Sequence, residues 1–443
     1  MQKDRWNELG HDRSMTTGLP IALLMVFFIV GMPIGIALGV AGVIGIYLAG
    51  GADVVLGLLT LAPYGTSASF ILTAVPMFVL MAEFITRGGI ARDLYHAAYK
   101  WMGHWPGGLA MATVMSSAMM GAMSGASTAS AAAITGASMP EMKRYGYDPS
   151  FATGTLAIGG TLAIMIPPSI PMVVYGVLTE TSIGQLFIAG IIPGIVTALL
   201  YMGVVWAWVR YDPRVAPHIP PFSWKERFAA LKPVWATVVL VTLLIGGMYV
   251  GLFTATEAGA VGAAGAFVIT AAMGRLKRAD VLPALYNTGM TTAMIMVIVI
   301  GAHFFAYFLT IAGVTQTVSG ALAASPLGPM GTMVLIILPI YLLLGMFMDN
   351  VPILLLTLPV VFPAVVAMGF DPIWFGVIVI VMGEIGLVTP PVGLTVFVVS
   401  SVAKVPLDKV FRGAAPFLLA EAVMIALLLA VPELATFLPK LMK

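Results

Sequence analysis

Long apolar runs, separated by short polar or glycine- and proline-rich breaks, occupy most of the chain. Runs of this length match the roughly 20 apolar residues that a helix needs to cross a bilayer. The first run, 19–50, is interrupted at Gly31-Met-Pro33, which predicts two short crossings. The pattern therefore predicts an all-α polytopic membrane protein. Further crossings are predicted at about 64–88, 185–209, 233–253, 256–274, 288–312 and 408–432.

Two apolar segments are interrupted too near their middle to be simple crossings. Residues 106–146 are broken at Ser124-Gly125-Ala126-Ser127, and residues 330–370 are broken near Met348-Asp349-Asn350-Val351. Each limb is shorter than the roughly 20 residues of a full span. Both segments are therefore predicted to be re-entrant hairpins with their tips at the breaks. An amphipathic arm, 92–103, is expected at the membrane interface before the first hairpin.

Two other apolar segments, 150–182 and 372–402, each contain a proline pair. Pro167-Pro168 and Pro390-Pro391 remove backbone donors and push the preceding residue out of the α region, so each helix is expected to break there. Carbonyls freed inside a membrane are tolerated where they line a protein-enclosed cavity. Two helices broken at matching positions indicate the binding site of a secondary transporter. The alternative is a pair of structural proline kinks.

The broken segments belong to a longer duplication. Gly160-Thr-Leu-Ala-Ile-Met-Ile-Pro-Pro-Ser169 recurs as Gly383-Glu-Ile-Gly-Leu-Val-Thr-Pro-Pro-Val392, offset by 223 positions, and Gly190-Ile-Ile-Pro193 recurs as Gly413-Ala-Ala-Pro416. One register relates nearly the whole chain, which predicts two structural repeats. The predicted organisation is a polar extension over 1–18, a first repeat over 19–209, a polar linker over 210–232, an uncharged connector over 313–329 and a second repeat over 233–435 that includes this connector.

Lysine and arginine residues predict the orientation of the chain. On the predicted topology, 16 of the 21 fall on one face of the membrane. Because positive charge marks cytoplasmic loops, this face is predicted to be cytoplasmic and the membrane to be the bacterial or archaeal inner membrane. The hairpins then open to opposite sides, which predicts inverted repeats. The basic segments are 87–100, 143–144, 210–232, 275–278 and 404–412.

Composition and missing motifs exclude other classes of protein. The chain is 60% hydrophobic and 9% charged, whereas soluble domains carry roughly 25% charged residues. A net charge of only +2 gives no reason to expect nucleic acid as a partner, and the absence of cysteine excludes thiolate chemistry. No Walker A loop and no HExxH motif is present, so neither ATP hydrolysis nor a zinc enzyme is predicted.

Oxygen-rich residues gather at the hairpin tips and at the proline breaks. Ser124-Gly125-Ala126-Ser127 offers hydroxyls and carbonyls near Pro167, while Asp349-Asn350 and Thr389 do so near Pro390. Such clusters, with at most one charge, suit Na⁺. A carboxylate substrate is expected at the half-helix N-termini, whose free N–H groups favour anions. The alternative for each hydroxyl is a packing role, bonded to its own i−4 carbonyl.

Acidic residues within the apolar runs are functional candidates because a buried charge is costly there. Asp349 lies at a hairpin tip and Glu384 lies just before the second break, whereas Glu83, Glu257 and Glu421 have no such position. Any of them can carry a coupling proton, so the coupling ion stays open between Na⁺ and H⁺. The residues expected to hydrogen-bond substrate are Ser127, Ser169, Asn350 and Thr395.

Several motifs are shared with one known family. They are Pro140-Glu-Met-Lys-Arg-Tyr-Gly-Tyr147, Gly160–Ser169, Tyr175–Ile183, Gly345-Met-Phe-Met-Asp349 and Gly386-Leu-Val-Thr-Pro-Pro-Val-Gly393. Over about 19–435, the chain resembles the large membrane subunit of tripartite ATP-independent periplasmic (TRAP) transporters, the DctM-like family. The resemblance implies an ion-transporter-superfamily fold of elevator type, Na⁺ coupling, a periplasmic solute-binding protein and a small four-helix membrane subunit. Nothing before residue 19 holds four helices, so the small subunit is expected to be a separate chain.

The resemblance also implies where Na⁺ binds. In the family, the ion sites lie between each hairpin tip and its broken helix. The positions that correspond here are Ser124, Gly125, Ser127, Thr161, Ala163, Ile166, Asp349, Gly386 and Thr389. The chain departs from the family pattern at Ala126, Ala163 and Thr395, where the family has Ser, Gly and Asn.

The function predicted from these features is Na⁺-coupled import of an organic acid, with a binding protein. A standalone carboxylate carrier of the same architecture would need no binding protein. An ion channel would pass current without saturable uptake. A membrane enzyme would need a nucleophile–base or metal constellation, which the sequence does not contain.

Overall fold

The computed structural model describes residues 13–442, and over that range it is helical without strands. Eight helices are long and apolar enough to cross a membrane, or nine if one bent pair is a single span. This finding confirms an all-α polytopic membrane protein. Most of the polar extension predicted over 1–18 lies outside the described residues, and α2 (Arg13–Ile29) already begins within it.

The chain forms two compact units, which are described separately. Unit 1 holds the residues up to Phe70 together with Met290–Ile337 and Val351–Phe370, and unit 2 holds Ile71–Gly289, Leu338–Asn350 and the residues from Asp371 onward. Each unit draws on both predicted repeats. The compact units therefore do not coincide with the repeats.

Unit 1 is built on close contact between α3 and α16. Its helices are α2, α3 (Ile34–Gly50), α4 (Ala52–Ser67), the second part of α16 (Arg278–Ile311), α17 (Val314–Ala323), α18 (Gly328–Thr332) with a π-helical turn (Met333–Ile337), and most of α20 (Asn350–Ala367). A Cβ atom at Gly42 would lie 2.5 Å from the Phe305 backbone nitrogen. Glycine is therefore needed where these two helices touch.

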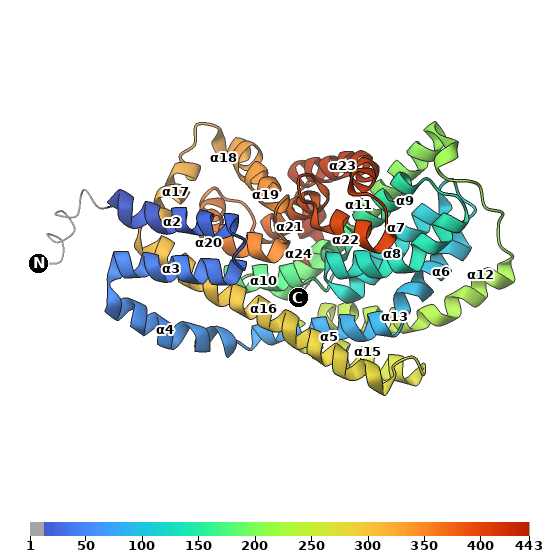
Figure 1. Ribbon diagram of the computed structural model, residues 1–443, viewed down its shortest axis with the longest axis horizontal. Coiled ribbons are helices and arrows are strands. Elements are labelled where there is room, and N and C mark those ends of the chain that lie inside the picture. The colour runs from blue at the N-terminus through green and yellow to red at the C-terminus, as the bar shows by residue number, and fades with distance from the viewer. Residues whose placement is uncertain (1–12, 443) are drawn as a thin grey trace, which may run out of the picture. The chain divides into compact units, whose positions relative to one another are not determined.

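Unit 2 is built around α9 (Pro149–Met165), which is almost entirely buried. It contacts α7 (Gly108–Ser124), α8 (Ser127–Arg144), α21 (Pro372–Val388), α22 (Leu394–Ala403) and α23 (Leu407–Ala430) (Figure 1). The other helices are α5 (Ala74–Arg87), α6 (Ile90–Met102), α10 (Ile170–Thr179), α11 (Ile183–Tyr211), α12 (Trp224–Leu231), α13 (Trp235–Val241), α14 (Gly247–Tyr249), α15 (Ala255–Ala272), α19 (Leu338–Gly345) and α24 (Glu433–Leu441).

The helix bounds recur with the spacing seen in the sequence. Both ends of α8 and α20 differ by 223 positions, and so do both ends of α9 and α21. The bounds of α10 and α22 differ by 224. A shared pattern of helix starts and ends follows because prolines, glycines and caps stand at matching positions in the two halves.

Helices also occur where the sequence predicted none. The polar linker 210–232 contains α12, which begins with a capping box between Ser223 and Glu226. The uncharged connector 313–329 contains α17, which begins after Gly313 in the left-handed conformation at φ 74°. A capping box thus accounts for the start of α12, whereas α17 begins after Gly313 without a side-chain cap.

Two predicted crossings have different limits. The crossing expected at 64–88 is two helices, α4 and α5, separated by the break at 68–70 and a 3₁₀ turn over Ile71–Thr73. α16 begins ten residues before its predicted start at 288, where the Lys277 amide donates to the Asp280 carboxylate at 3.0 Å. A further helix, α24, follows α23. Its buried side contacts α11.

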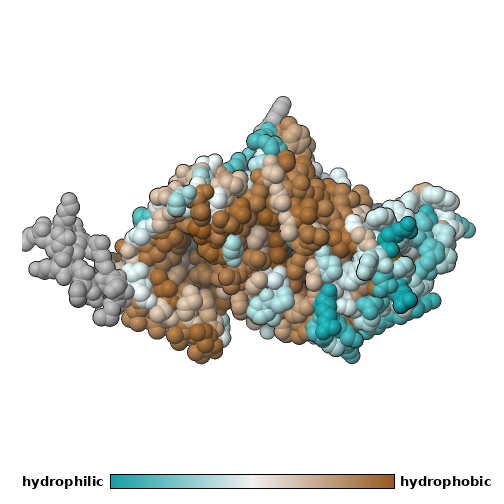
Figure 2. Space-filling view, turned by 90° about the horizontal axis from the view of Figure 1, so that it is seen from above, coloured by the Kyte–Doolittle hydropathy of each residue, from teal (hydrophilic) through white to brown (hydrophobic). Residues whose placement is uncertain are grey.

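The five basic segments lie together in unit 2. Figure 2 shows hydrophilic residues gathered at the end of this unit that carries α6 and α12. Their proximity is what a single membrane face requires. The joining contacts are Lys143 Nζ to the Ala403 carbonyl (2.8 Å), Ser150 Oγ to the Lys409 carbonyl (2.5 Å), the Asp148 amide to the Val215 carbonyl (2.9 Å), Lys100 to Glu226 (3.4 Å) and Arg275 to Asp93.

Candidate functional site

The first broken helix leaves the α conformation at its proline pair. Helix α9 ends at Met165, Ile166 is extended, and the Pro167–Pro168 peptide bond is cis. Helix α10 then begins after Ser169, whose Oγ accepts a hydrogen bond from the Met172 amide at 3.5 Å. Ser169 therefore acts as a helix cap, because its hydroxyl oxygen satisfies a free N–H at the start of α10.

The tip of the first hairpin closes directly onto this break. The Ile170 amide donates to the Gly125 carbonyl at 3.3 Å. Gly125 has φ 63°, and a Cβ atom there would lie 2.7 Å from the Pro168 carbonyl oxygen. Glycine is required on both grounds, since few other residues adopt this conformation and a side chain would collide with the break.

The hydroxyls of this first tip are buried. Ser127 begins α8 and is 2% exposed, while Ser124 is hydrogen-bonded to Ser130. Thr161 Oγ1 donates to the Ile158 carbonyl at 2.7 Å and lies 3.4 Å from the Tyr201 hydroxyl of α11. The Thr161 hydroxyl is thus bonded within α9 and turned toward α11.

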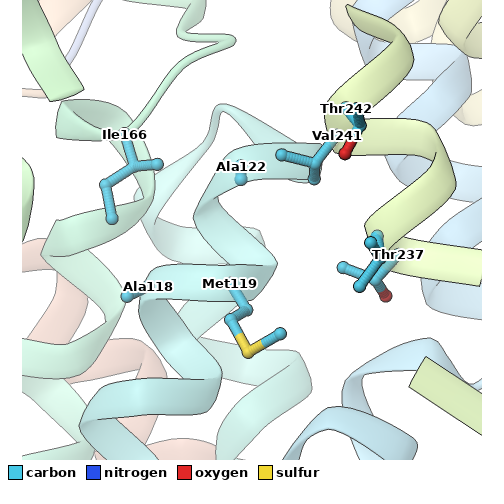
Figure 3. Close-up of a pocket in the computed structure, with 8 residues that line it drawn as sticks. Ala118, Met119, Ala122, Ile166, Thr237, Val241 and Thr242 are labelled. Carbon is cyan, nitrogen blue, oxygen red and sulfur yellow. The ribbon is translucent and has the colours of Figure 1, made fainter. Parts of the chain in front are cut away.

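Ala163 and Ile166 have no polar side chain and present only backbone polar atoms. A Cβ atom at Gly121 of α7 would lie 2.7 Å from the Ala163 Cα atom, so the first hairpin packs closely on α9 at this residue. Ile166 lines a cavity of about 320 Å³ beside the first break. Figure 3 shows its side chain across this cavity from Val241 and Thr242. Because most of the lining is apolar, the cavity does not suit a carboxylate or an ion.

The second broken helix has the same outline with different chemistry. Helix α21 ends at Val388, the Pro390–Pro391 bond is cis, and Gly393 at φ 62° precedes α22. Thr389 Oγ1 donates to the Ile385 carbonyl at 2.5 Å. This bond to the carbonyl four residues earlier is the packing role expected of a hydroxyl that binds no ligand. It uses the Thr389 proton and leaves the oxygen lone pairs available to an ion.

The tip of the second hairpin contacts this break through backbone atoms. The Gly393 amide donates to the Met346 carbonyl at 3.4 Å. A Cβ atom at Gly386 would lie 2.3 Å from the Gly345 carbonyl carbon. Both glycines are therefore needed for α19 and α21 to approach each other.

Two polar side chains stand at this second tip. Asp349 Oδ1 accepts a hydrogen bond from the backbone N–H of Asn350 at 2.7 Å. Asn350 is 1% exposed, and neither its side-chain oxygen nor its side-chain nitrogen has a hydrogen-bond partner. Its Oδ1 lies against α21, only 1.8 Å from where a Cβ atom of Gly383 would be. A buried amide without partners is costly, which marks this position for a ligand or a water molecule.

Thr395 links the second broken helix to the first. It is fully buried, its Oγ1 has no partner, and its methyl group lies 3.2 Å from the position of a Cβ atom at Gly160. Helix α22 thus packs on α8 and α9 of the first half. The structure places Thr395 beside α9 rather than at either tip.

A polar cluster in the interior was not recognised from the sequence. The Tyr201 hydroxyl donates to Glu421, whose other carboxyl oxygen has no partner, and both oxygens of the fully buried Glu384 are also unpartnered. No sequence pattern singles out Tyr201, because it lies inside an ordinary apolar run. Among residues 13–442, no three or more His, Cys, Asp or Glu side chains group as a metal site would need.

The other two acidic candidates have ordinary structural partners. Glu83 pairs with Arg87 one turn away at 3.0 Å and also accepts from the Asn287 side chain. Glu257 forms a capping box with Thr254 at the start of α15. Both carboxylates are satisfied locally, so neither needs a coupling ion to explain it.

Comparison with known proteins identifies relatives of this chain. The family described as tripartite ATP-independent periplasmic transporter, DctM component, matches residues 21–434. A C4-dicarboxylate TRAP transporter large permease protein, DctM, of Pseudomonas aeruginosa is 38% identical over 86% of this chain and 89% of its own. The ectoine TRAP transporter large permease protein TeaC of Halomonas elongata is 33% identical over 96% of this chain and 99% of its own.

A solved structure shares the fold at low identity. The YdaH transporter of Alcanivorax borkumensis superimposes with a TM-score of 0.61 over 86% of this chain and 89% of its own, at 14% identity. The family match covers both hairpins and both broken helices, and the relatives match nearly their whole length. The chain belongs to the DctM family of TRAP transporter large permease proteins and is a membrane transport subunit rather than an enzyme.

Proposed function

We propose that this chain imports an organic acid with a Na⁺ gradient, together with a periplasmic binding protein and a small membrane subunit. The observation that carries the proposal is the pair of junctions in unit 2, at which a hairpin tip is bonded to a proline break. Ile170 bonds Gly125 at the first, and Gly393 bonds Met346 at the second. Freed carbonyls and hydroxyls then surround each junction, as cation sites in broken helices require.

The two junctions provide different oxygen ligands for Na⁺. At the first, the candidates are Ser127 and the carbonyls of Gly125, Thr161, Ala163 and Ile166. At the second, Asp349 adds a carboxylate to the Gly386 carbonyl and the Thr389 hydroxyl. Na⁺ rather than H⁺ is favoured at the first junction, because it contains no titratable side chain.

A carboxylate is the substrate class that the start of α22 favours. Helix α22 begins beside the second break without a side-chain cap, and free N–H groups at such an end attract anions, whereas the first amides of α10 are already bonded to Gly125 and Ser169. Asn350 and Thr395 are buried and unpartnered, so they are the side chains we assign to the substrate. The name of the Pseudomonas relative, which refers to C4-dicarboxylates, supports the same class.

The repeats are proposed to be inverted, with the junctions carried by a domain that moves as an elevator. The matching bounds of α8–α9 and α20–α21 support the repeat. The basic segments support an orientation with their end of unit 2 toward the cytoplasm. One relative, the isethionate TRAP transporter permease protein DctMQ of Oleidesulfovibrio alaskensis, is longer than this chain, which covers 64% of it. A separate small subunit is proposed here.

The test is uptake by the reconstituted chain and its small subunit in liposomes. Labelled organic acids, including C4-dicarboxylates, are supplied with and without a Na⁺ gradient and with and without the cognate binding protein. Uptake that requires both supports the proposal. Uptake without the binding protein supports the standalone carrier, and current without saturable uptake supports a channel.

A further inference from the structure

The helix that follows the central linker carries an exposed aromatic stripe. Helical structure runs from Trp224 to Tyr249 over 26 residues. Trp224, Phe228, Leu231 and Trp235 recur at helical spacing along its first half and are 65%, 59%, 40% and 49% exposed. Positions separated by four, three and four residues lie on one side of a helix. The stripe therefore faces outward as one continuous surface.

One side of this helix is held against α6, and the edge of the stripe shares in this contact, since the Trp101 ring centre lies 6.1 Å from that of Trp224 and 5.7 Å from that of Phe228. The Trp101 indole nitrogen donates to the Arg227 carbonyl at 3.0 Å, and Lys100 pairs with Glu226 at 3.4 Å. Ala230 on the same side is buried. These contacts fix the rotation of the helix, so the exposure of the stripe is a consequence of packing.

Basic side chains border the stripe on both edges. Lys225 and Lys232 are exposed along one edge. On the other edge, the Arg227 guanidinium lies 5.0 Å from the centre of the Trp224 ring. The acidic neighbour, Glu226, is exposed, but it is already paired with Lys100 and bonded to Ser223. The exposed surface thus joins aromatic rings to uncompensated positive charge.

We propose that this aromatic-basic stripe binds anionic phospholipid headgroups of the leaflet that faces the basic segments. Tryptophan and phenylalanine rings settle at the headgroup level of a membrane, and nearby lysines attract anionic lipids. Beyond Trp235, the exposed side continues with Val238, Val239 and Leu243, which suit acyl chains. The change from aromatic and basic to aliphatic residues matches the polarity gradient of one leaflet. The site depends neither on the coupling ion nor on the transported solute.

The absence of cysteine allows a clean labelling test. The full chain, purified with its small subunit, carries a fluorescent nitrobenzoxadiazole group at Phe228→Cys on the stripe. The control is His218→Cys, which is exposed in the linker before this helix. Each is placed in nanodiscs of phosphatidylcholine containing spin-labelled phosphatidylglycerol or spin-labelled phosphatidylcholine as the quencher.

The proposal predicts strong lipid quenching at position 228 and weak quenching at 218. Spin-labelled phosphatidylglycerol should quench the 228 label more than spin-labelled phosphatidylcholine does. The preference for phosphatidylglycerol should fall roughly fivefold in Lys225→Gln and again roughly fivefold when Lys232→Gln is added. The double variant Lys225→Arg with Lys232→Arg keeps both charges and should retain the preference.

Three results would overturn the proposal. A 228 label that no lipid quenches would show that a protein partner covers the stripe. Equal quenching by the two spin-labelled lipids would show that the stripe does not select anionic headgroups, and so would an unchanged preference in the Lys→Gln variants. Because quenching is measured without transport, these results are separate from any failure of the uptake experiment.

Discussion

The two junctions between hairpin tip and broken helix share an outline but differ in what surrounds them. The first is made of glycine, small hydroxyls and backbone carbonyls, with Gly125 against Pro168 and Ser127 buried beside them. The second adds Asp349 and the unpartnered Asn350. The difference indicates that an ion at the first junction depends mainly on backbone position, whereas an ion at the second depends on particular side chains.

The largest effect is expected from restoring helix at one break. Replacing Pro167 and Pro168 by alanine returns two backbone donors and removes the restriction on Ile166, so α9 can continue. Uptake should be abolished while membrane insertion is retained. Pro140→Ala, a proline within α8, is the control and should preserve uptake. Normal uptake in the double variant would contradict the role of the break.

The next effect is expected from crowding the second junction. Gly386→Ala places a Cβ atom 2.3 Å from the Gly345 carbonyl carbon, which the two helices must move apart to accommodate. Overpacking of this kind costs about 1–3 kcal/mol, so uptake should fall roughly tenfold or more. Gly289→Ala is the control because nothing lies within 4 Å of its Cβ position. Equal uptake in the two variants would exclude a tight junction.

Removing the carboxylate of the second junction tests the role of side chains. Asp349→Ala should raise the Na⁺ concentration for half-maximal uptake by roughly 10- to 100-fold, which corresponds to about 1.5–3 kcal/mol for a charged partner. Asp408→Ala, at an exposed position on α23, should leave the Na⁺ response unchanged. If both variants respond to Na⁺ like the wild type, Asp349 is not a ligand.

A smaller effect is expected at the first junction. Ser127→Ala removes one neutral hydroxyl, worth about 1 kcal/mol, so the Na⁺ requirement should rise roughly fivefold. The comparison of the two junctions depends on this value being smaller than that for Asp349→Ala. A Ser127→Ala effect as large as that of Asp349→Ala would mean that side chains matter equally at both.

The smallest effect is expected from the helix cap. Ser169→Ala should lower the free energy of unfolding by about 1 kcal/mol, measured by thermal unfolding in detergent, and should leave the substrate KM unchanged. Ser169→Thr keeps a capping hydroxyl and should restore stability. A raised KM with unchanged stability would instead place Ser169 in contact with substrate.

Local chain chemistry was sufficient to predict the breaks, the tips and the repeat. Proline acts on its own and the preceding residue, and glycine at a tip acts on its own backbone, so neither needs distant partners. The same reasoning located the break between α7 and α8, the break between α19 and α20, and both proline breaks. It did not find α12, which begins with a capping box, or α17, which begins after Gly313 without a side-chain cap.

Tertiary packing decided which side chains meet. The amino-acid order placed Thr161 near a predicted ion site, but the rotation of α9 turns its hydroxyl toward Tyr201 of α11. Thr395 lies beside Gly160 of the other half, and Glu421 receives a hydrogen bond from Tyr201, 220 positions earlier. Such pairings depend on how helices rotate and cross, which many residues set together. Periodicity along one helix therefore cannot specify them.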